Sequence, residues 1–179
     1  MFLLITRRLI KAKENLEVAA YTDALTGTFN RRYFHKYIQQ LSAPNLIMMM
    51  VDINNLKQIN DKFGHHCGDK VIKVVADTLK RYSENKGFTI RWGGDEFLVI
   101  LCNKNKQKFQ NLTDQIKADI SQYCIIANKA QIPITVSIGI AEQLKGETFI
   151  DTVNRVDKKM YQEKNIIHRR SGPRYTSGL

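Results

Sequence analysis

The sequence predicts one α+β domain, in which a mostly antiparallel central sheet is flanked by helices and preceded by a short helical stalk. Residues 45–52 (NLIMMMVD) form a continuous apolar run, which is typical of a strand buried on both faces. Two short apolar runs are joined by Gly93–Gly94, which is the signal of a hairpin. The order strand, helix, strand, strand, helix, strand is the βαββαβ arrangement of a split βαβ fold.

The individual elements follow from local patterns. In chain order they are a helix at 31–41, a strand at 45–52, a helix from Asp69, strands at 88–92 and 97–101, a helix at 106–124, a strand at 132–141 and a helix at 149–165. Apolar residues at helical spacing predict the helices, and short apolar runs predict the strands. Right-handed crossovers then place the first long strand beside the third, and these two strands run antiparallel.

Composition restricts the class of protein. The chain has 179 residues, of which 43% are hydrophobic and 25% charged, and this balance fits a single globular domain. The net charge of +11 favours an anionic partner: a nucleotide, a nucleic acid or an acidic membrane surface. Cys67, Cys102 and Cys124 form no CxxC pair, so we expect a reducing, cytoplasmic environment without disulfides. No apolar run is long enough for a membrane span, and a signal peptide is not indicated.

The first twenty residues form a separate stalk in this interpretation, followed by a domain at 21–170 and a disordered basic tail at 171–179. Two heptad positions in the stalk are occupied by Phe2, Leu9 and Leu16, and by Ile5, Ala12 and Ala19. The stalk could pair with a parallel copy of itself, lie on the domain as an amphipathic helix, or be the cytoplasmic end of a membrane helix. The third alternative would put the protein at the cytoplasmic face of the inner membrane, with a membrane or sensor segment upstream.

Acidic residues stand at two points that this topology brings together. Asp52 closes the first long strand, and Asp95 opens the third after the two glycines. Antiparallel neighbours lie about 5 Å apart, which is the right scale for two ligands of one cation. The glycines are expected to allow a tight turn with positive φ and to let a bulky ligand approach the backbone.

Several motifs occur in a fixed order along the chain. They are DALTGTFNRR at 23–32, DINNLK at 52–57, ND at 60–61, GHHCGD at 64–69, RWGGDEF at 91–97, TVSIGIA at 135–141 and DKKMYQEK at 157–164. Together they resemble the GGDEF domain, the catalytic domain of diguanylate cyclases, over roughly residues 21–170. The resemblance implies a fold like the palm of polymerases and the nucleotidyl cyclases. It also implies a nucleotidyltransferase, active as a homodimer, that condenses two GTP molecules into cyclic di-GMP and releases two pyrophosphates.

The resemblance assigns roles to the acidic residues. Asp52, Asp95 and Glu96, together with the carbonyl of Ile53, would hold Mg²⁺, for which Mn²⁺ could substitute. Asp95 or Glu96 would take the proton of the attacking 3′-hydroxyl. The family precedent favours Asp95, but the sequence does not separate the two.

The resemblance also assigns the binding of the nucleotide. Asn60 and Asp69 would read guanine, whose N1–H and N2–H₂ are adjacent donors, although Asp69 could alternatively cap a helix start. His65 would lie beside the ribose and base, or would make a hydrogen bond at the helix entry. Phosphate contacts would come from Lys57, which we also class as catalytic, from Lys164 and from the backbone N–H groups of Asn55 and Leu56.

Three positions depart from the family pattern. Asn54 replaces a second acid, which removes one negative charge near the metal. His168 stands where an arginine often follows the lysine matched by Lys164. Residues 84–87 (ENKG) replace the Arg-x-x-Asp motif that binds product in relatives, so we expect no product inhibition through this site.

Two other functions compete with an active cyclase. A degenerate domain could bind GTP as a sensor without turnover, but such domains usually lose the signature acids, which are present here. A nucleic-acid binder is suggested by the charge, but it would need exposed aromatic residues among basic ones. The aromatic residues here stand mostly at core spacing, so no nucleic-acid partner is expected.

Overall fold

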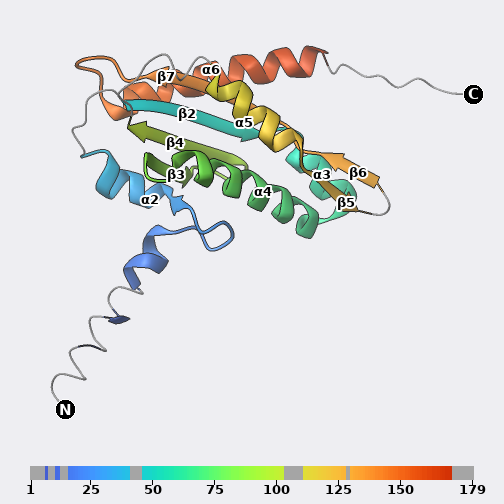
Figure 1. Cartoon of the computed structure of the whole chain (residues 1–179), viewed down its shortest axis with the longest axis horizontal. Helices are drawn as coiled ribbons and strands as arrows, with labels where there is room; N and C mark the ends of the chain where they lie inside the picture. The colour runs from blue at the N-terminus through green and yellow to red at the C-terminus, as the bar shows by residue number, and fades with distance from the viewer. Residues whose placement is uncertain are drawn as a thin grey trace, which may run out of the picture.

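The computed structural model describes residues 7, 11–12, 16–40, 46–102, 111–127 and 130–170. Its main sheet has five strands in the order β1-β3-β4-β2-β7 (Figure 1). They are β1 (Phe29–Asn30), β2 (Leu46–Ile53), β3 (Gly87–Arg91), β4 (Glu96–Cys102) and β7 (Val136–Glu142). Only the short β1 pairs in parallel, with β3, so the sheet is mostly antiparallel as predicted.

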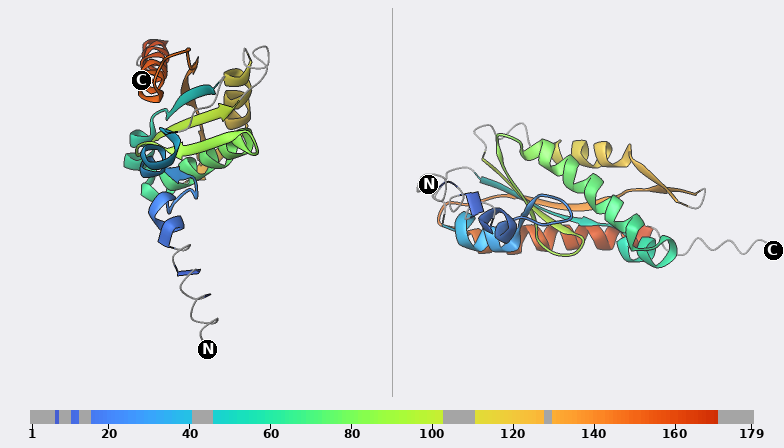
Figure 2. Two further views of the ribbon diagram at one scale, coloured as in Figure 1. Left: turned by 90° about the vertical axis from the view of Figure 1, so that its left-hand side faces the viewer. Right: turned by 90° about the horizontal axis from the view of Figure 1, so that it is seen from below.

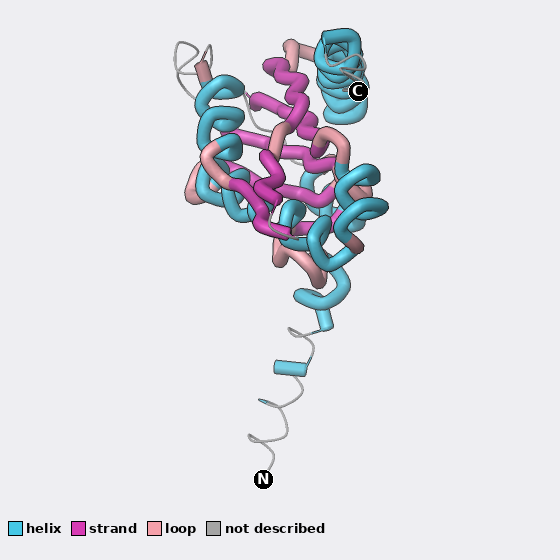
Figure 3. The backbone as a smooth tube through the Cα atoms, turned by 90° about the vertical axis from the view of Figure 1, so that its right-hand side faces the viewer, coloured by secondary structure: helices cyan, strands magenta, loops and turns pink. Residues whose placement is uncertain are grey.

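Helices cover both faces of the sheet. They are α2 (Arg31–Tyr33) with the π-helical turn η1 (Phe34–Ile38), α3 (Leu56–Phe63), α4 (His65–Ser83), α5 (Leu112–Ser121) and α6 (Phe149–Arg170). In the view from below in Figure 2, α4 and α5 lie on one side of the strands, and α2 and α6 lie on the other. Figure 3 shows the strands enclosed between these helix layers.

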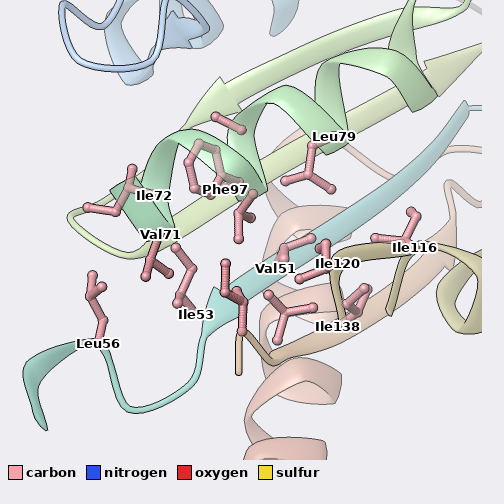
Figure 4. Packing of buried hydrophobic residues seen from close by; sticks show 14 of the residues in the cluster. Val51, Ile53, Leu56, Val71, Ile72, Leu79, Phe97, Ile116, Ile120 and Ile138 are labelled. Carbon is pink, nitrogen blue, oxygen red and sulfur yellow. The ribbon is translucent and has the colours of Figure 1, made fainter. Parts of the chain in front are cut away.

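The central strand β2 explains why residues 46–53 are so apolar. Every residue of β2 is buried, because the strand has a neighbour on each side and helices on each face. Alternate side chains go to opposite faces. Met49, Val51 and Ile53 join the core under α4 and α5, part of which Figure 4 shows. Met48 and Met50 join the core under α6 and η1.

The predicted β2–β4 pairing is confirmed, and several boundaries differ from prediction. Asp69 does not begin a helix: α4 begins at His65, and a separate helix, α3, precedes it. The joint between them is the single residue Gly64, at φ 84°, a left-handed value that glycine adopts without strain. The helix predicted at 31–41 is a short α-turn continued by the π-helical turn η1.

The C-terminal half also differs from prediction. The strand predicted at 132–141 is two strands: β6 (Ala130–Pro133) pairs with β5 (Cys124–Ala127) in a separate hairpin, and β7 belongs to the main sheet. The helix predicted at 106–124 is described only as α5, and 103–110 lie outside the described residues. The helix α6 continues to Arg170, five residues beyond its predicted end.

Most of the predicted stalk and the whole predicted tail at 171–179 lie outside the described residues. Of the six heptad positions, Ala12, Leu16 and Ala19 are described, and all three are helical. Residues 16–21 form a helical segment in which Leu16 is 71% exposed. Within the part of the chain that the structure covers, no helix combines the length and apolarity needed to cross a bilayer.

Candidate functional site

The two acidic points lie side by side at one end of the sheet. In the β2–β4 ladder Asp52 is directly opposite Glu96, and the Ile53 N–H donates a hydrogen bond of 3.1 Å to the Asp95 carbonyl. The side chains of Asp52 and Glu96 lie on the α6 face, because they share the alternation of Met50 and Leu98. The fold therefore brings together strand positions that are 44 residues apart in sequence.

Negative charge is concentrated at this strand end. Burial raises the pKa of Glu96, and repulsion from Asp95, Asp52 and Asp157 raises it further, while the Lys164 ammonium opposes the shift. Lys164 Nζ lies 2.7 Å from Asp52 Oδ2, and the Asp52 side chain is only 4% exposed. The Lys164 ammonium of helix α6 therefore forms an ion pair with Asp52.

The turn between β3 and β4 corrects one prediction. Neither Gly93 nor Gly94 has a positive φ. The two positions differ in the space around them: a Cβ at Gly93 would lie 2.8 Å from Glu96 Oε2, whereas a Cβ at Gly94 would meet nothing within 4 Å. Gly93 leaves room for the acid, and Gly94 leaves open space above the turn.

A helix start without a side-chain cap follows β2. Asn55 precedes α3 in the left-handed region (φ 59°, ψ 20°) and makes no side-chain capping hydrogen bond. Asparagine tolerates this conformation better than most residues. The first N–H groups of a helix attract anions. Asn55 and Lys57 are exposed and Leu56 between them is buried, so the helix start matched to phosphate binding has exposed residues on either side of Leu56.

The predicted guanine readers lie where α3 meets α4. Asn60 Oδ1 is buried and has no hydrogen-bond partner among the described residues. It fills the space of a side chain at Gly68, since a Cβ there would lie 1.9 Å from this oxygen. Asp69 follows Gly68 directly and is half-buried; because it is the fifth residue of α4, the alternative role as a helix cap is wrong. His65, the first residue of α4, is exposed.

Asn54 is a brace rather than a lost metal ligand. It is buried, its Oδ1 accepts a hydrogen bond of 2.8 Å from Ser137 Oγ, and its Nδ2 donates one of 3.3 Å to Thr135 Oγ1. The Asn54 N–H also donates to the Thr135 carbonyl. Sequence reasoning missed this role, because both hydroxyl partners lie more than eighty residues away in the sequence.

Arg91 is a second residue whose role sequence reasoning missed. Its Nη1 donates to both carboxylate oxygens of Asp23, at 3.0 and 3.2 Å, and its Nη2 donates to the Gly94 carbonyl at 2.7 Å. The arginine therefore joins the segment that follows helical residues 16–21 to the glycine turn. Burial alone would raise the pKa of Asp23, but hydrogen bonds from Thr26 and Arg91 and the charge of Arg91 lower it below its ordinary value.

The acids fit a hard divalent cation that is shared with a substrate. Across the described ranges, no three His, Cys, Asp or Glu side chains come together as a ready-made metal cage. Mg²⁺ does not need one, because it is usually held by one or two carboxylates, water and substrate phosphates. The crowding of carboxylates that raises the pKa of Glu96 is the charge that such an ion would neutralise.

A mostly antiparallel sheet with helices on both faces, and with acids gathered at the end of its central strand, is the arrangement expected of a nucleotidyltransferase domain. The chain belongs to the diguanylate cyclase family: the family model described as "Diguanylate cyclase, GGDEF domain" matches residues 20–170.

Relatives and solved structures agree with this family. The chain is 33% identical over 162 residues to diguanylate cyclase DgcM of Escherichia coli K12, covering 87% of this chain and 38% of that protein. It is 27% identical to diguanylate cyclase VdcA of Vibrio cholerae, covering 94% of this chain and 52% of that one. The crystal structure of the coiled coil and GGDEF domain of DgcB from Caulobacter crescentus with c-di-GMP matches at TM-score 0.82 and 26% identity, covering 95% and 91% of the two chains. The chain thus spans about half or less of the length of these curated relatives.

Proposed function

We propose that this chain is the catalytic part of a diguanylate cyclase that condenses two GTP molecules into cyclic di-GMP and two pyrophosphates. The observation that carries the proposal is the placement of Asp52 opposite Glu96, with Asp95 joined to Ile53 through the backbone. Each half-reaction forms a bond between a 3′-oxygen and an α-phosphorus and breaks the α–β phosphoanhydride bond. We further propose that two copies of the domain face each other, because each supplies one GTP.

Different residues of this chain bind the guanine, the phosphates and the ribose of the nucleotide. Asp69 and Asn60 bind the guanine edge, the orphaned Asn60 Oδ1 being an acceptor already directed to that joint. Phosphates are bound by the N–H groups of Asn55 and Leu56 and by the ammonium groups of Lys57 and Lys164. His65 lies beside the ribose. Phosphoryl transfer depends mainly on such positioning and charge neutralisation.

A hydroxyl proton must be accepted when the 3′-oxygen attacks, and the acceptor is Asp95 or Glu96. Asp52, the Ile53 carbonyl and the two signature acids are the residues that would hold Mg²⁺, or Mn²⁺ in its place. When bound, the ion supplies charge neutralisation at the phosphates and a lower pKa for the attacking hydroxyl.

The test is the product formed from GTP and Mg²⁺, separated by chromatography. The wild type is expected to form cyclic di-GMP, and Asp95→Ala is expected to lower the rate at least about a hundredfold because it removes a carboxylate from the reacting centre. A matched control is Asp151→Ala, which removes an exposed acid at the start of α6 that contacts Thr148.

Retained turnover in Asp95→Ala with an unchanged circular dichroism spectrum would contradict the proposal. GTP binding by a wild type that forms no product would instead support a GTP-binding sensor. Incubation with GTP and ATP together tests whether both half-sites require guanine.

A further inference from the structure

The backbone of β7 at the sheet edge is covered by side chains of helix α6. Three contacts make up this cover: Arg155 Nη2 to the Glu142 carbonyl (2.6 Å), Lys159 Nζ to the Ile140 carbonyl (3.0 Å), and the Ile138 N–H to Glu163 Oε2 (2.5 Å). Successive partners are four residues apart in the helix and two apart in the strand. Those steps correspond to rises of about 6.0 Å and about 6.7 Å, so the helix stays in register with the strand.

Glu163 differs from the other two side chains because separate elements use its two carboxylate oxygens. Oε2 accepts the Ile138 N–H, while Oε1 accepts a hydrogen bond from Lys117 Nζ of α5. The helices α5 and α6 pack on opposite faces of the sheet (Figure 2). The Glu163 carboxylate therefore reaches round the edge of the sheet and joins both helix layers to β7.

The residue after Glu163 is the lysine that reaches Asp52. Ile138 directly follows Ser137, and Ser137 is the partner of Asp52 in the β2–β7 ladder. The point at which α6 is pinned is therefore one residue from the strand position opposite Asp52. Since a lysine ammonium is a point charge on a flexible stem, its place depends on where the helix backbone is held.

We propose that Glu163 is a positioning residue of the nucleotide site. By holding α6 to Ile138 and Lys117, it places the Lys164 ammonium at the strand end where substrate phosphates bind. This inference rests on the proposed function, because it takes Lys164 as a phosphate-binding residue. Glu163 contacts β7 and α5 and acts only through Lys164.

A double-mutant cycle on nucleotide binding tests the proposal. The affinity for α,β-methylene GTP with Mg²⁺ is measured by isothermal titration calorimetry for the wild type, Glu163→Ala, Lys164→Met and the double variant. Glu163→Ala is expected to bind roughly three- to tenfold more weakly. The double variant is expected to bind no more weakly than Lys164→Met, because residues that act through one contact are not additive.

Two further variants separate positioning from general loosening of the helix. Glu163→Gln keeps an acceptor for the Ile138 N–H and is expected to bind within about twofold of the wild type. Lys159→Met removes the neighbouring contact to the same strand, about one helical turn before Glu163, and is expected to have a smaller effect than Glu163→Ala. Additive losses in the double variant, or Glu163→Gln as weak as Glu163→Ala, would overturn the proposal.

The same measurements distinguish this inference from the proposed function, because binding of the analogue needs no turnover. If the losses of affinity in the single variants do not add in the double variant, and the wild type forms no cyclic di-GMP, the inference is supported and the proposed function is contradicted. If the losses add and the wild type forms cyclic di-GMP, the proposed function is supported and the inference is contradicted. A wild type that does not bind the analogue would contradict both.

Discussion

At the scale of single residues, the Arg155–Glu147 pair shows how a hydrogen-bonded partner shifts the pKa of an acid. Arg155 Nε and Nη2 donate to the two Glu147 carboxylate oxygens at 2.9 and 2.6 Å. The hydrogen bonds from Arg155 lower the pKa of Glu147 to about 2, although burial opposes the shift. Because the ionised form is favoured in the folded state, this acid stabilises the fold at neutral pH.

Stability should therefore depend on pH through Glu147. Its contribution is complete above the ordinary pKa of 4.5 and is lost as the pH falls toward about 2. We expect the difference in free energy of unfolding between the wild type and Glu147→Gln to be largest above about pH 5 and to shrink below it. Urea denaturation at several pH values measures this difference, and one that stays constant from pH 6 to about pH 3 would contradict the prediction.

Some site residues could be predicted from sequence and others could not, for physical reasons. Asp52 and Asp95 could be placed together because hairpin connectivity and right-handed crossovers determine which strands are neighbours. The brace at Asn54 could not, because its partners, Thr135 and Ser137, are more than eighty residues away and their hydroxyls carry no pairing signal. The positive φ expected at Gly93 and Gly94 could not be checked from sequence, because glycine is compatible with either sign of φ and neither residue has a positive value here.

At the scale of elements, α6 approaches β7 closely enough to require a glycine. A Cβ at Gly139 would lie 2.0 Å from the Val156 carbonyl oxygen and 2.4 Å from the Met160 nitrogen. Both atoms belong to the helix backbone, so neither can move aside without shifting α6. This close approach also allows the side chains of α6 to reach the backbone of the edge strand.

Gly139→Ala should consequently destabilise the protein by about 1–3 kcal/mol or more. Gly94→Ala is the matched control, since its added Cβ has open space and should change stability by less than about 0.5 kcal/mol. The midpoint of urea denaturation measures both. A Gly139→Ala variant as stable as Gly94→Ala would mean that α6 is not held as closely as described.

The elements that sequence reasoning missed are those with weak or short patterns. The helix α3 has only eight residues, and it meets α4 at the single residue Gly64, so its pattern merges with the glycine-rich motif around it. The two-residue β1 is too short for any period to appear. The strands β6 and β7 form one apolar run in sequence, and the sign of the break at Ile134 and Thr135 is Pro133, at which β6 ends.

At the scale of the whole molecule, the face around residues 84–87 bears on product binding, because the family resemblance implies an Arg-x-x-Asp motif at this window in members that bind product. Glu84 and Gly87 occupy the first and last positions of the window here. A Cβ at Gly87 would lie 1.8 Å from the Ile100 carbonyl oxygen. A cavity of about 470 Å³ at this window is lined by Asp77 and Glu84 as well as by Lys80 and Arg81, so carboxylates face any incoming phosphate.

We therefore expect no micromolar binding of cyclic di-GMP at this cavity. Isothermal titration of cyclic di-GMP into protein saturated with α,β-methylene GTP, which blocks the active site, measures it. Micromolar binding that Lys80→Met or Arg81→Met abolishes would contradict the prediction.

The hydrogen bonds of Arg91 connect two segments that are far apart in the sequence. One guanidinium holds Asp23, just after helical residues 16–21, and Gly94, the residue before the first signature acid. Rotation of that N-terminal helix would therefore act on the turn between β3 and β4 through the hydrogen bonds of Arg91. A displacement of helical residues 16–21 would in this way be transmitted through a single side chain to the turn that precedes Asp95.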